Sequence, residues 1–555
     1  MVVSSPAAAK PFRPWRDLRW ITGAVVAAFI GGLAWNLFGP EPPIRVSRET
    51  TFLTEPLAAD GLPDYEAAIL AMHGPAPPPD ENAAVLLLQA CWPLEIDAAD
   101  LPTLCTALGI PHVPPAERLR EPGRDAASGV TDEMLERIGR PWPCEPAPEL
   151  VAWLRANAPL IDRMVEAAAR PRYWLASPSL LDAKPDMAIG MPLPDIQAIR
   201  SVARILSYRA SVSLAENRPA DAWRDVAAIH RLARLLVPGA KTEKCSAPLV
   251  TQLVAIAIDG VAQDLTRRLV SLPDLPADVL AAIRRDIDSF GPPVVAAGTH
   301  AFERVSGIDA IVWMARRAGG RAGRWRLIGH TGLGGVDPTP PALFTSLDWN
   351  VVLARTNAAY DELETACRLP THADRVAELR RQEQAIRDRV QAPRRSAWTI
   401  AGDLLMQACN RGHRSERVGD VLLDLLMPVL SSVMTALGRA EAEVALTRTA
   451  AALAAWRADR EPGAPEYPER LDDLVPRYLA AVPVDPFTDQ PLVYERRDAG
   501  YLLASVGQNG VYDGGTDWHG WIVGGEWQEV DKDVAYDRSD QVVRMPMPRR
   551  KVQPP

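Results

Sequence analysis

The sequence predicts a mainly α-helical protein with a transmembrane helix near the N-terminus and a small α+β domain at the C-terminus. Three observations support this fold class. Residues 20–38 are apolar and uncharged, the region 81–420 contains segments with apolar residues at helical spacing, and two short strand-like runs follow residue 490. A chain of 555 residues is too long for one ordinary core, so about two to four domains are expected.

The first predicted element is a transmembrane signal anchor at 20–38. Its 19 uncharged residues are enough helix to cross a hydrocarbon core of about 30 Å. The flanking charged residues are Lys10, Arg13, Arg16 and Arg19, opposed by Asp17. The positive-inside rule therefore places the basic tail 1–19 in the cytoplasm. No small-x-small cleavage site follows, so we expect a retained anchor in a bacterial inner membrane, single-pass, with the bulk of the chain in the periplasm.

The middle of the chain is predicted to be extracytoplasmic and helical. Residues 39–80 are proline-rich and predict a tether, and 81–420 alternate helical segments with proline loops. Helical spacing is clearest at 195–236, where ENRP at 216–219 interrupts the pattern and predicts an antiparallel helical hairpin. A glycine-rich stretch at 320–341 lacks the lysine and Ser/Thr of a phosphate-binding loop, so we interpret it as a surface loop.

Residues 421–437 are nearly apolar, yet we predict a buried helix rather than a second membrane span. Asp424 would cost roughly 2.5–3.5 kcal/mol at a bilayer centre, and Pro428 interrupts helical hydrogen bonding. A long amphipathic helix that packs on downstream elements is predicted next. Its apolar stripe is Val433, Leu437, Ala440, Val444, Thr447 and Ala451, and its polar face is Arg439, Glu441, Glu443, Arg448 and Arg457.

Two short strands are predicted near the C-terminus, at 492–496 and 501–506, joined by a turn at 497–500. The segment before them, "YPERLDDLVPRYLAAVPVDPFTDQPLVYE", predicts a small helix, a proline break and a turn into the first strand. We interpret 421–545 as one α+β domain, with a long helix on a short antiparallel sheet, and 546–555 as a disordered tail.

The order of spaced residues across about 430–545 resembles the C-terminal part of the major pseudopilin of type II secretion. This stretch is about a fifth of the chain. The matching residues are Tyr467, Pro468, Leu471, Leu474, Tyr478, Leu479, Pro483, Asp485, Pro486, Phe487, Tyr494, Tyr501, Leu503, Ser505, Gly507, Asn509, Gly510, Gly514 and Gly515. With the N-terminal anchor, this pattern is also similar to that of uncharacterised membrane-anchored bacterial proteins that end in such a module.

The resemblance implies a calcium ion in the loop after the sheet. Calcium prefers about six to eight hard oxygen ligands around a glycine-permitted tight loop. The candidate ligands are Asn509, Asp513, Asp517, Asp531 and Asp533. The alternative is a solvated acidic turn without an ion. The insert WHGWIVGGEWQEV at 518–530 departs from the short loop of the family and puts the ligand set in question.

The N-terminus also departs from the pseudopilin pattern. It lacks the family's processed glycine–phenylalanine motif and the glutamate early in the mature apolar helix. A subunit that polymerises through its first helix is therefore disfavoured. A membrane protein that carries the pseudopilin-like head as a rigid terminal domain fits the sequence better.

No catalytic motif is present. The eight histidines are dispersed, without HExxH or an i,i+4 histidine pair, and no GxSxG or SxxK motif occurs. His230 lies in an alanine-rich segment and is interpreted as a packed or edge histidine. The cysteines have no metal-thiolate spacing, and either disulfides or buried free thiols remain open for Cys91, Cys105, Cys144, Cys245, Cys367 and Cys409.

The leading interpretation is a non-enzymatic binding or scaffold protein of the cell envelope. The net charge of −9 argues against nucleic acid as the main partner. The expected partners are the inner membrane, through 20–38, and envelope or secretion-apparatus proteins. Two alternatives stay open: a pseudopilin-like component of a type II secretion or pilus-type apparatus, and an envelope hydrolase whose site no motif reveals.

Overall fold

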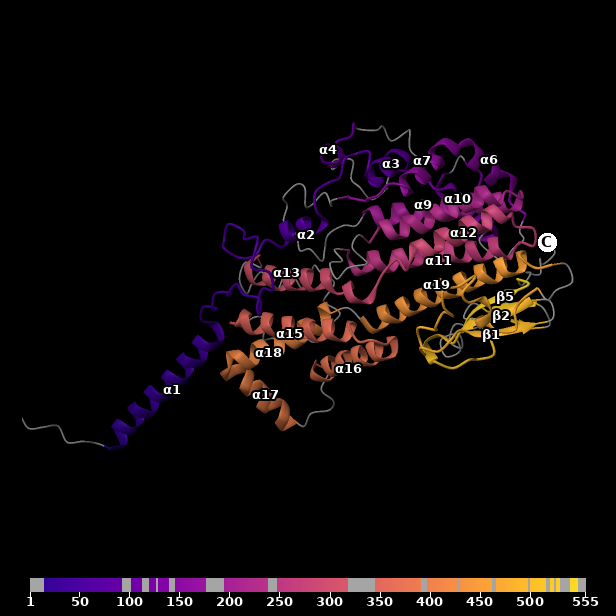
Figure 1. Cartoon of the computed structure of the whole chain (residues 1–555). Helices are drawn as coiled ribbons and strands as arrows, with labels where there is room; N and C mark the ends of the chain where they lie inside the picture. Colours follow the sequence, from indigo (N-terminus) through magenta and orange to yellow (C-terminus); the bar gives the residue numbers. More distant parts are fainter. Residues whose placement is uncertain are drawn as a thin grey trace, which may run out of the picture. The chain divides into compact units, whose positions relative to one another are not determined.

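The computed structural model divides the chain into two compact units (Figure 1). The first unit consists of Met1–Pro63, Ile308–Ala359 and Gln384–Met427, and the second of Asp64–Gly307, Tyr360–Glu383 and Pro428–Pro555. Each unit is therefore assembled from three separate stretches of sequence. The structure describes residues 14–91, 101–111, 119–125, 128–138, 145–175, 194–237, 247–317, 345–390, 397–427, 430–461, 466–497, 500–515, 520–523, 526–529 and 540–547.

The described chain is mainly helical, as predicted. The first unit contains α1 (Pro14–Phe38), α17 (Ala397–Cys409) and α18 (Arg411–Leu426), and α13 (Ala301–Arg317), α15 (Trp349–Cys367) and α16 (His372–Val390) contribute residues to both units. The second unit contains α2 (Tyr65–His73), α3 (Ala83–Ala90), α4 (Leu101–Ala107), α5 (Asp132–Ile138), α6 (Pro148–Ala156), α7 (Ala158–Ala168), α9 (Pro194–Ala215), α10 (Pro219–Leu235), α11 (Leu249–Ser271), α12 (Ala277–Phe290) and α19 (Leu430–Ala458).

The predicted helical hairpin is confirmed as α9 and α10, which pack against each other. Pro219 occupies the first turn of α10, where its missing N–H removes no helical hydrogen bond. Asn217 turns the chain with a φ of 55°, a left-handed conformation that asparagine tolerates better than most residues. The N–H of Arg218 donates to the carbonyl of Ser213 (2.8 Å), which closes the end of α9.

The helix α19 is the predicted long amphipathic helix, and it is packed on two sides. Val433, Leu437 and Val444 of the predicted apolar stripe are buried. The helix contacts β2 (Gly500–Ser505), β5 (Gln541–Met545) and the 3₁₀ turns η7 (Leu471–Leu474) and η8 (Gly507–Asn509), which lie downstream as expected. It also packs against α11 and α12, which come earlier in the chain.

The predicted polar face of α19 is therefore partly covered by protein. Glu443 pairs with Arg267 of α11. Arg448 donates to the backbone carbonyl of Ile287 in α12 (3.3 Å), and Arg457 donates to the carbonyl of Leu272 (2.7 Å). Sequence periodicity did not show that these charged residues meet other helices.

Three antiparallel strands form the C-terminal sheet in the order β1-β2-β5, where β1 is Val493–Arg497. Tyr494 pairs with Leu503, and Leu503 pairs with Val543. The predicted hairpin is confirmed with shifts of one residue at the strand ends, and β2 is buried along its whole length. The strands β3 (Gly520–Val523) and β4 (Glu526–Glu529) form a separate antiparallel pair.

Asp485 fixes the turn that leads into the sheet. Its buried carboxylate accepts hydrogen bonds from the N–H of Phe487 (3.0 Å) and from the N–H of Val506 (2.8 Å). The first bond closes the local turn and the second joins it to the end of β2. In the same region, the hydroxyl of Tyr494 donates to the carbonyl of Pro468 (2.8 Å). Several residues behind the family resemblance thus hold this turn and sheet together.

In the first unit, the segment predicted as a tether makes specific contacts with α15. The indole of Trp349 donates to the carboxylate of Glu41 (2.9 Å), and the amide N–H of Arg45 donates to the side chain of Asn350 (2.8 Å). Asn357 also donates to the carbonyl of Arg48. These residues are therefore part of a packed structure.

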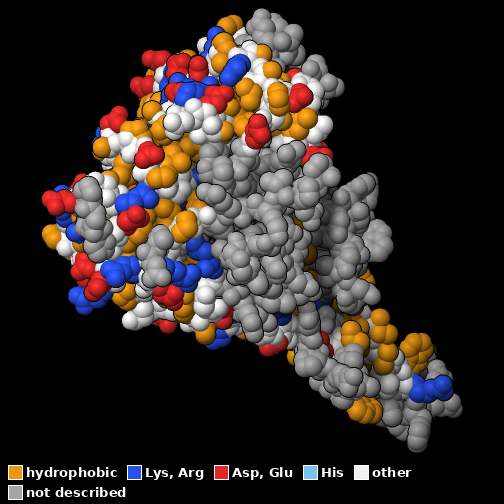
Figure 2. Space-filling view, turned by 90° about the vertical axis from the view of Figure 1, so that its right-hand side faces the viewer, with side chains coloured by type: hydrophobic (Ala, Val, Ile, Leu, Met, Phe, Trp, Pro, Cys, Tyr) orange, Lys and Arg blue, Asp and Glu red, His pale blue; other side chains and the backbone are white. Residues whose placement is uncertain are grey.

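Among the residues that the structure describes, three helical segments are long and apolar enough to cross a membrane: Arg19–Phe38, Leu249–Ser271 and Arg411–Ala458. The first has 0% of its apolar window buried within the structure, whereas the other two are 56% and 50% buried. Figure 2 shows hydrophobic side chains on the arm at the lower right, where the N-terminal helix projects. Leu422 and Leu423 are buried, in keeping with the interior helix predicted at 421–437; Pro428 lies outside the described residues.

Candidate functional site

The loop after β2 is the first candidate site. Asn509 ends η8, and its amide nitrogen donates to the carboxylate of Asp513 (2.8 Å). The structure thus brings these two predicted ligands together. The other three predicted ligands, Asp517, Asp531 and Asp533, lie outside the described residues.

Asp540, which the sequence analysis did not single out, organises this loop. Its carboxylate is fully buried and accepts hydrogen bonds from the N–H of Asp513 (3.0 Å) and the N–H of Gly515 (2.9 Å). Gly515 adopts a φ of +77°, and a Cβ there would lie 2.7 Å from a methyl carbon of Leu502. The loop therefore needs glycine at 515 and an acceptor at 540. The sequence patterns did not predict β5, and Asp540 immediately precedes that strand. This is why its role was missed.

The chemistry of this loop suits a hard cation. Asp513 and Asp540 supply carboxylate oxygens, the type of ligand that calcium prefers. Within the described residues, no group of three or more histidine, cysteine, aspartate or glutamate side chains has the geometry of a metal site. The described part of the loop thus supplies a partial oxygen donor set.

A second candidate is a buried polar network around His230 in α10. The Nδ1 atom of His230 lies 2.6 Å from Oδ1 of Asp259, and its Nε2 atom lies 3.1 Å from Oγ1 of Thr266. The hydroxyl of Thr266 donates its single proton to the carbonyl of Ala262 (2.7 Å). An ionised carboxylate can only accept, so Nδ1 of His230 donates to Asp259 and this bond fixes the orientation of the buried ring.

Asp259 and Arg234 complete this network. Arg234 donates to Oδ1 of Asp259 (2.6 Å) and to the carbonyl of Phe290 at the end of α12 (3.0 Å). Burial alone would raise the pKa of Asp259, but the charges and hydrogen bonds of His230 and Arg234 hold it well below its usual range. One carboxylate therefore joins α10 to α11, and the arginine continues the connection to α12.

The arrangement Thr266–His230–Asp259 has the order of a nucleophile, base and acid, but it cannot work as a triad. The side chain of Thr266 is 0% exposed and its proton is engaged by Ala262. A nucleophile must reach a substrate and give its proton to the base. The network therefore joins helices, and the prediction that His230 is a packed histidine is confirmed.

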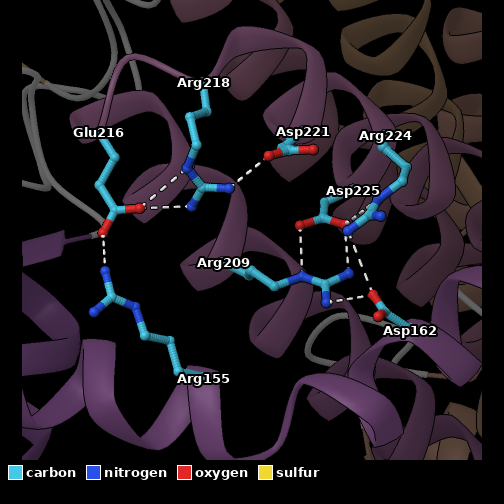
Figure 3. Close-up of polar contacts among 8 residues, drawn as sticks. All are labelled: Arg155, Asp162, Arg209, Glu216, Arg218, Asp221, Arg224 and Asp225. Atoms are coloured by element: carbon cyan, nitrogen blue, oxygen red, sulfur yellow. Dashed lines mark hydrogen bonds and ion pairs between the residues drawn. The ribbon is translucent and has the colours of Figure 1, made fainter.

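A third cluster of charged side chains joins α6, α7, α9 and α10 (Figure 3). Arg209 binds Asp225 through two parallel hydrogen bonds of 2.8 and 2.7 Å, and it also donates to Asp162 (2.8 Å). Asp225 is 1% exposed, so this pair is shielded from water. A planar guanidinium bound to a carboxylate by two bonds fixes both distance and orientation.

The outer part of the same cluster lies at the turn of the helical hairpin. Glu216 accepts hydrogen bonds from Arg155 of α6 (2.8 Å) and from Arg218 (2.6 Å), and Arg218 also pairs with Asp221 (2.5 Å). Figure 3 shows these side chains turned toward one another. Because they are substantially exposed, each pair contributes only about 0–1 kcal/mol. Their main effect is to orient the hairpin turn on α6.

His300 and Glu303, which the sequence places close together, turn to different partners. His300 lies 3.7 Å from Glu364, whereas Glu303 accepts a hydrogen bond from the N–H of Leu249 (2.8 Å) at the start of α11. Burial raises the pKa of Glu303 above its ordinary value. The two side chains therefore do not form a common ligand set.

Among the cysteines of the described residues, Cys91, Cys367 and Cys409 are free thiols. Burial raises the pKa of Cys91 to about 12, so this thiol is not a nucleophile at neutral pH. Cys144 and Cys245 lie outside the described residues.

Comparison with known proteins gives no relative: no protein-family profile, no curated protein and no solved structure matches this chain.

Proposed function

We propose that this chain is a single-pass, membrane-anchored binding or scaffold protein of the bacterial cell envelope, with α1 as its anchor and a pseudopilin-like region at its C-terminus. The bulk of the chain is extracytoplasmic in this proposal. The inner membrane is its first partner, and proteins of the envelope or of a secretion apparatus are the others.

The exposure of Arg19–Phe38 carries the proposal. No part of its apolar window is buried by the described structure. The exposed large apolar side chains are Trp20, Ile21, Val25, Val26, Phe29, Ile30, Trp35 and Phe38. Contact between this surface and water is unfavourable by about 25 cal/mol per Å², and an apolar surface of this extent marks an interaction site. Burial of this surface in lipid removes its contact with water, and the basic residues before it favour a cytoplasmic N-terminus.

The polar clusters support a binding or scaffold role. The charged networks around His230 and Arg209 join three and four helices, respectively, and Thr266 is closed to substrate. Such networks fix the arrangement of helices and keep their outer surfaces constant. A protein that docks partners at the membrane requires a helical surface of fixed shape that is held there by an anchor.

A second candidate, a pseudopilin-like component of a secretion or pilus-type apparatus, is favoured by one observation. The long helix α19 packs on the sheet β1-β2-β5, and a glycine-rich loop with acidic residues follows, as the resemblance implies. However, α19 also packs against α11 and α12, so it is not free to assemble into a filament. Co-purification of secretion subunits with the full-length chain would favour this candidate over a free-standing scaffold.

We include calcium at the terminal loop in the proposal, because the described oxygens suit it. Titration of the full-length chain in detergent should show binding at roughly 10⁻⁴–10⁻³ M, the range of extracellular calcium modules. The melting temperature should rise with calcium and fall with chelator, and Asp513→Ala should abolish the shift. Equal melting curves in calcium and chelator would leave the loop a solvated turn.

The anchor is tested by a pair of matched triple variants. One variant is Val25→Asp, Val26→Asp and Phe29→Asp in α1, and its control is Val250→Asp, Leu253→Asp and Val261→Asp, all exposed positions of α11. We expect the wild type and the control in the membrane fraction after an alkaline wash, and the α1 variant in the soluble fraction. Protease added to spheroplasts should digest the bulk of the wild-type chain. Recovery of the wild type in the soluble fraction, or its full protection, would overturn the proposal.

A further inference from the structure

The helix α17 presents an apolar surface that no described residue covers. Trp398 is 87% exposed, Leu405 is 62% exposed, Leu404 is 57% exposed and Met406 is 50% exposed. Four large apolar side chains within 13 residues of helix are a substantial surface for a soluble region. Some other molecule should cover it.

The C-terminal end of α17 is fixed to the last turn of α1, in the same compact unit. The side-chain amide of Asn36 donates to the carbonyl of Cys409 (3.1 Å). The buried guanidinium of Arg414 donates to the side chain of Asn36 (3.0 Å) and to its carbonyl (2.8 Å). Arg414 also donates to the carbonyl of Gln407 in the last turn of α17. The two helices are therefore joined where α1 ends.

From this junction, α17 runs crosswise to α1 (Figure 1). This step rests on the proposed function, in which α1 crosses the bilayer and ends at its outer surface. A helix that lies across a spanning helix at that level lies along the membrane surface. Its length of 13 residues, about 20 Å, is too short to span but suits an interfacial segment.

The charges of α17 also suit an interface. Asp403 is the only charged residue of the helix. Its carboxylate is bound by Nε2 of His413 (2.9 Å) and by the amide of Gln407 (3.0 Å), which lowers the cost of placing it near lipid. In the sequence, Arg394 and Arg395 precede the helix and Arg411 follows it, so that basic residues flank both ends. Lipid phosphates attract such residues.

We propose that α17 is an interfacial helix whose apolar side chains insert into the outer leaflet of the bilayer that α1 crosses. The occupant of this surface is phospholipid, because α17 packs against α1, the helix whose own exposed apolar side chains are assigned to lipid. The chain then holds the membrane at two places, which orients the first unit on it rather than leaving it free to rotate about α1.

The test uses the full-length chain in vesicles of phosphatidylcholine and phosphatidylglycerol. Single cysteines carrying an environment-sensitive fluorophore are placed by Leu405→Cys in α17, Val26→Cys in α1 and Leu57→Cys, an exposed position elsewhere in the first unit. The native cysteines are replaced, and folding is verified by circular dichroism and thermal melting. Brominated phosphatidylcholine is the quencher, with bromine placed either near the headgroup or deep in the acyl chain.

We expect label 405 to be quenched at least about 2-fold more than label 57, most strongly by shallow bromine, and label 26 to be quenched by deep bromine. If label 26 is quenched while label 405 matches label 57, the anchor stands and the α17 proposal is wrong; the surface would then await a protein. If label 26 is not quenched, the anchor itself fails, and the α17 proposal fails with it.

A second measurement avoids the loss of native cysteines. The wild-type chain and Trp398→Phe differ by one indole, so the difference between their brominated-lipid quenching reports on position 398 alone. Our proposal requires a smaller quenched fraction in Trp398→Phe. An equal quenched fraction in the two chains would contradict contact between α17 and lipid.

Discussion

The buried imidazole of His372 makes the stability of the second unit depend on pH. Its ring lies against Gly438 of α19 and contacts the ring of Phe487 edge-on, with centroids 4.9 Å apart. Burial, together with the charges of Arg375 and Arg380, lowers the pKa of His372 to about 4. The folded chain therefore keeps this ring neutral through the mildly acidic range.

The sign of the effect follows from proton uptake. Between pH 6.5 and 4 the unfolded chain binds a proton at His372 and the folded chain does not, so the free energy of unfolding falls as pH falls. The loss approaches about 3 kcal/mol near pH 4. We expect the difference in the free energy of unfolding between wild type and His372→Gln, measured by chemical denaturation, to change by this amount between pH 7 and pH 4. A constant difference across this range would show that His372 is not neutral in the folded state.

At the scale of single residues, the sequence predicted burial correctly where a local pattern indicated it. His230 in an alanine-rich helix and the apolar stripe of α19 were predicted correctly, since helical periodicity places such residues inside. Asp540 and Arg414 were not, because their roles depend on backbone groups of segments that only the fold brings near. No spacing in one sequence encodes such partners.

At the scale of secondary-structure elements, the backbone of Met545 in β5 lies very close to Gly500, at the turn of the β1–β2 hairpin. A Cβ on Gly500 would overlap the carbonyl oxygen of Met545 in β5, which is backbone and cannot rotate away. Gly510 offers a matched control, because it has a φ of +68° but nothing within 4 Å of the added carbon. Gly510→Ala should cost about 1 kcal/mol from backbone strain alone.

We therefore expect Gly500→Ala to lower the free energy of unfolding by about 2 kcal/mol more than Gly510→Ala, through the overlap with β5. Denaturation of both full-length variants in detergent measures the difference. Comparable losses in the two variants would mean that β5 can shift without cost, so that its pairing with β2 is weak.

Prediction of elements succeeded where the pattern was local. The helical hairpin of α9 and α10 has a proline at the start of its second helix. The hairpin of β1 and β2 has short alternating strands. The strand β5 lies far from its partner in sequence, so local patterns could not pair it. Residue patterns predicted the long helix and the hairpin but not the contacts of α19 with α11 and α12.

For the whole molecule, the chain passes between its two units several times. Each unit takes residues from three stretches, so no single cut in the sequence releases an intact unit. The division into consecutive domains, with 421–545 as the last, remains a prediction about which segments fold as units. The contacts themselves group the region from Pro428 onward with Asp64–Gly307.

This grouping predicts that the C-terminal region does not fold alone. In a fragment of 428–555, α19 would keep its contacts with β2 and β5 but lose α11 and α12, and its buried Leu446, Thr447 and Leu453 would lose partners or protection from water. Glu443 would also lose Arg267. We expect this fragment to be aggregated or partly unfolded, with poor chemical-shift dispersion in its ¹H–¹⁵N spectrum. The full-length chain should protect the same amides from hydrogen exchange. A well-dispersed spectrum and a cooperative melt of the fragment would instead show an autonomous pseudopilin-like domain, for which contact with α11 and α12 is a docking of two folded parts.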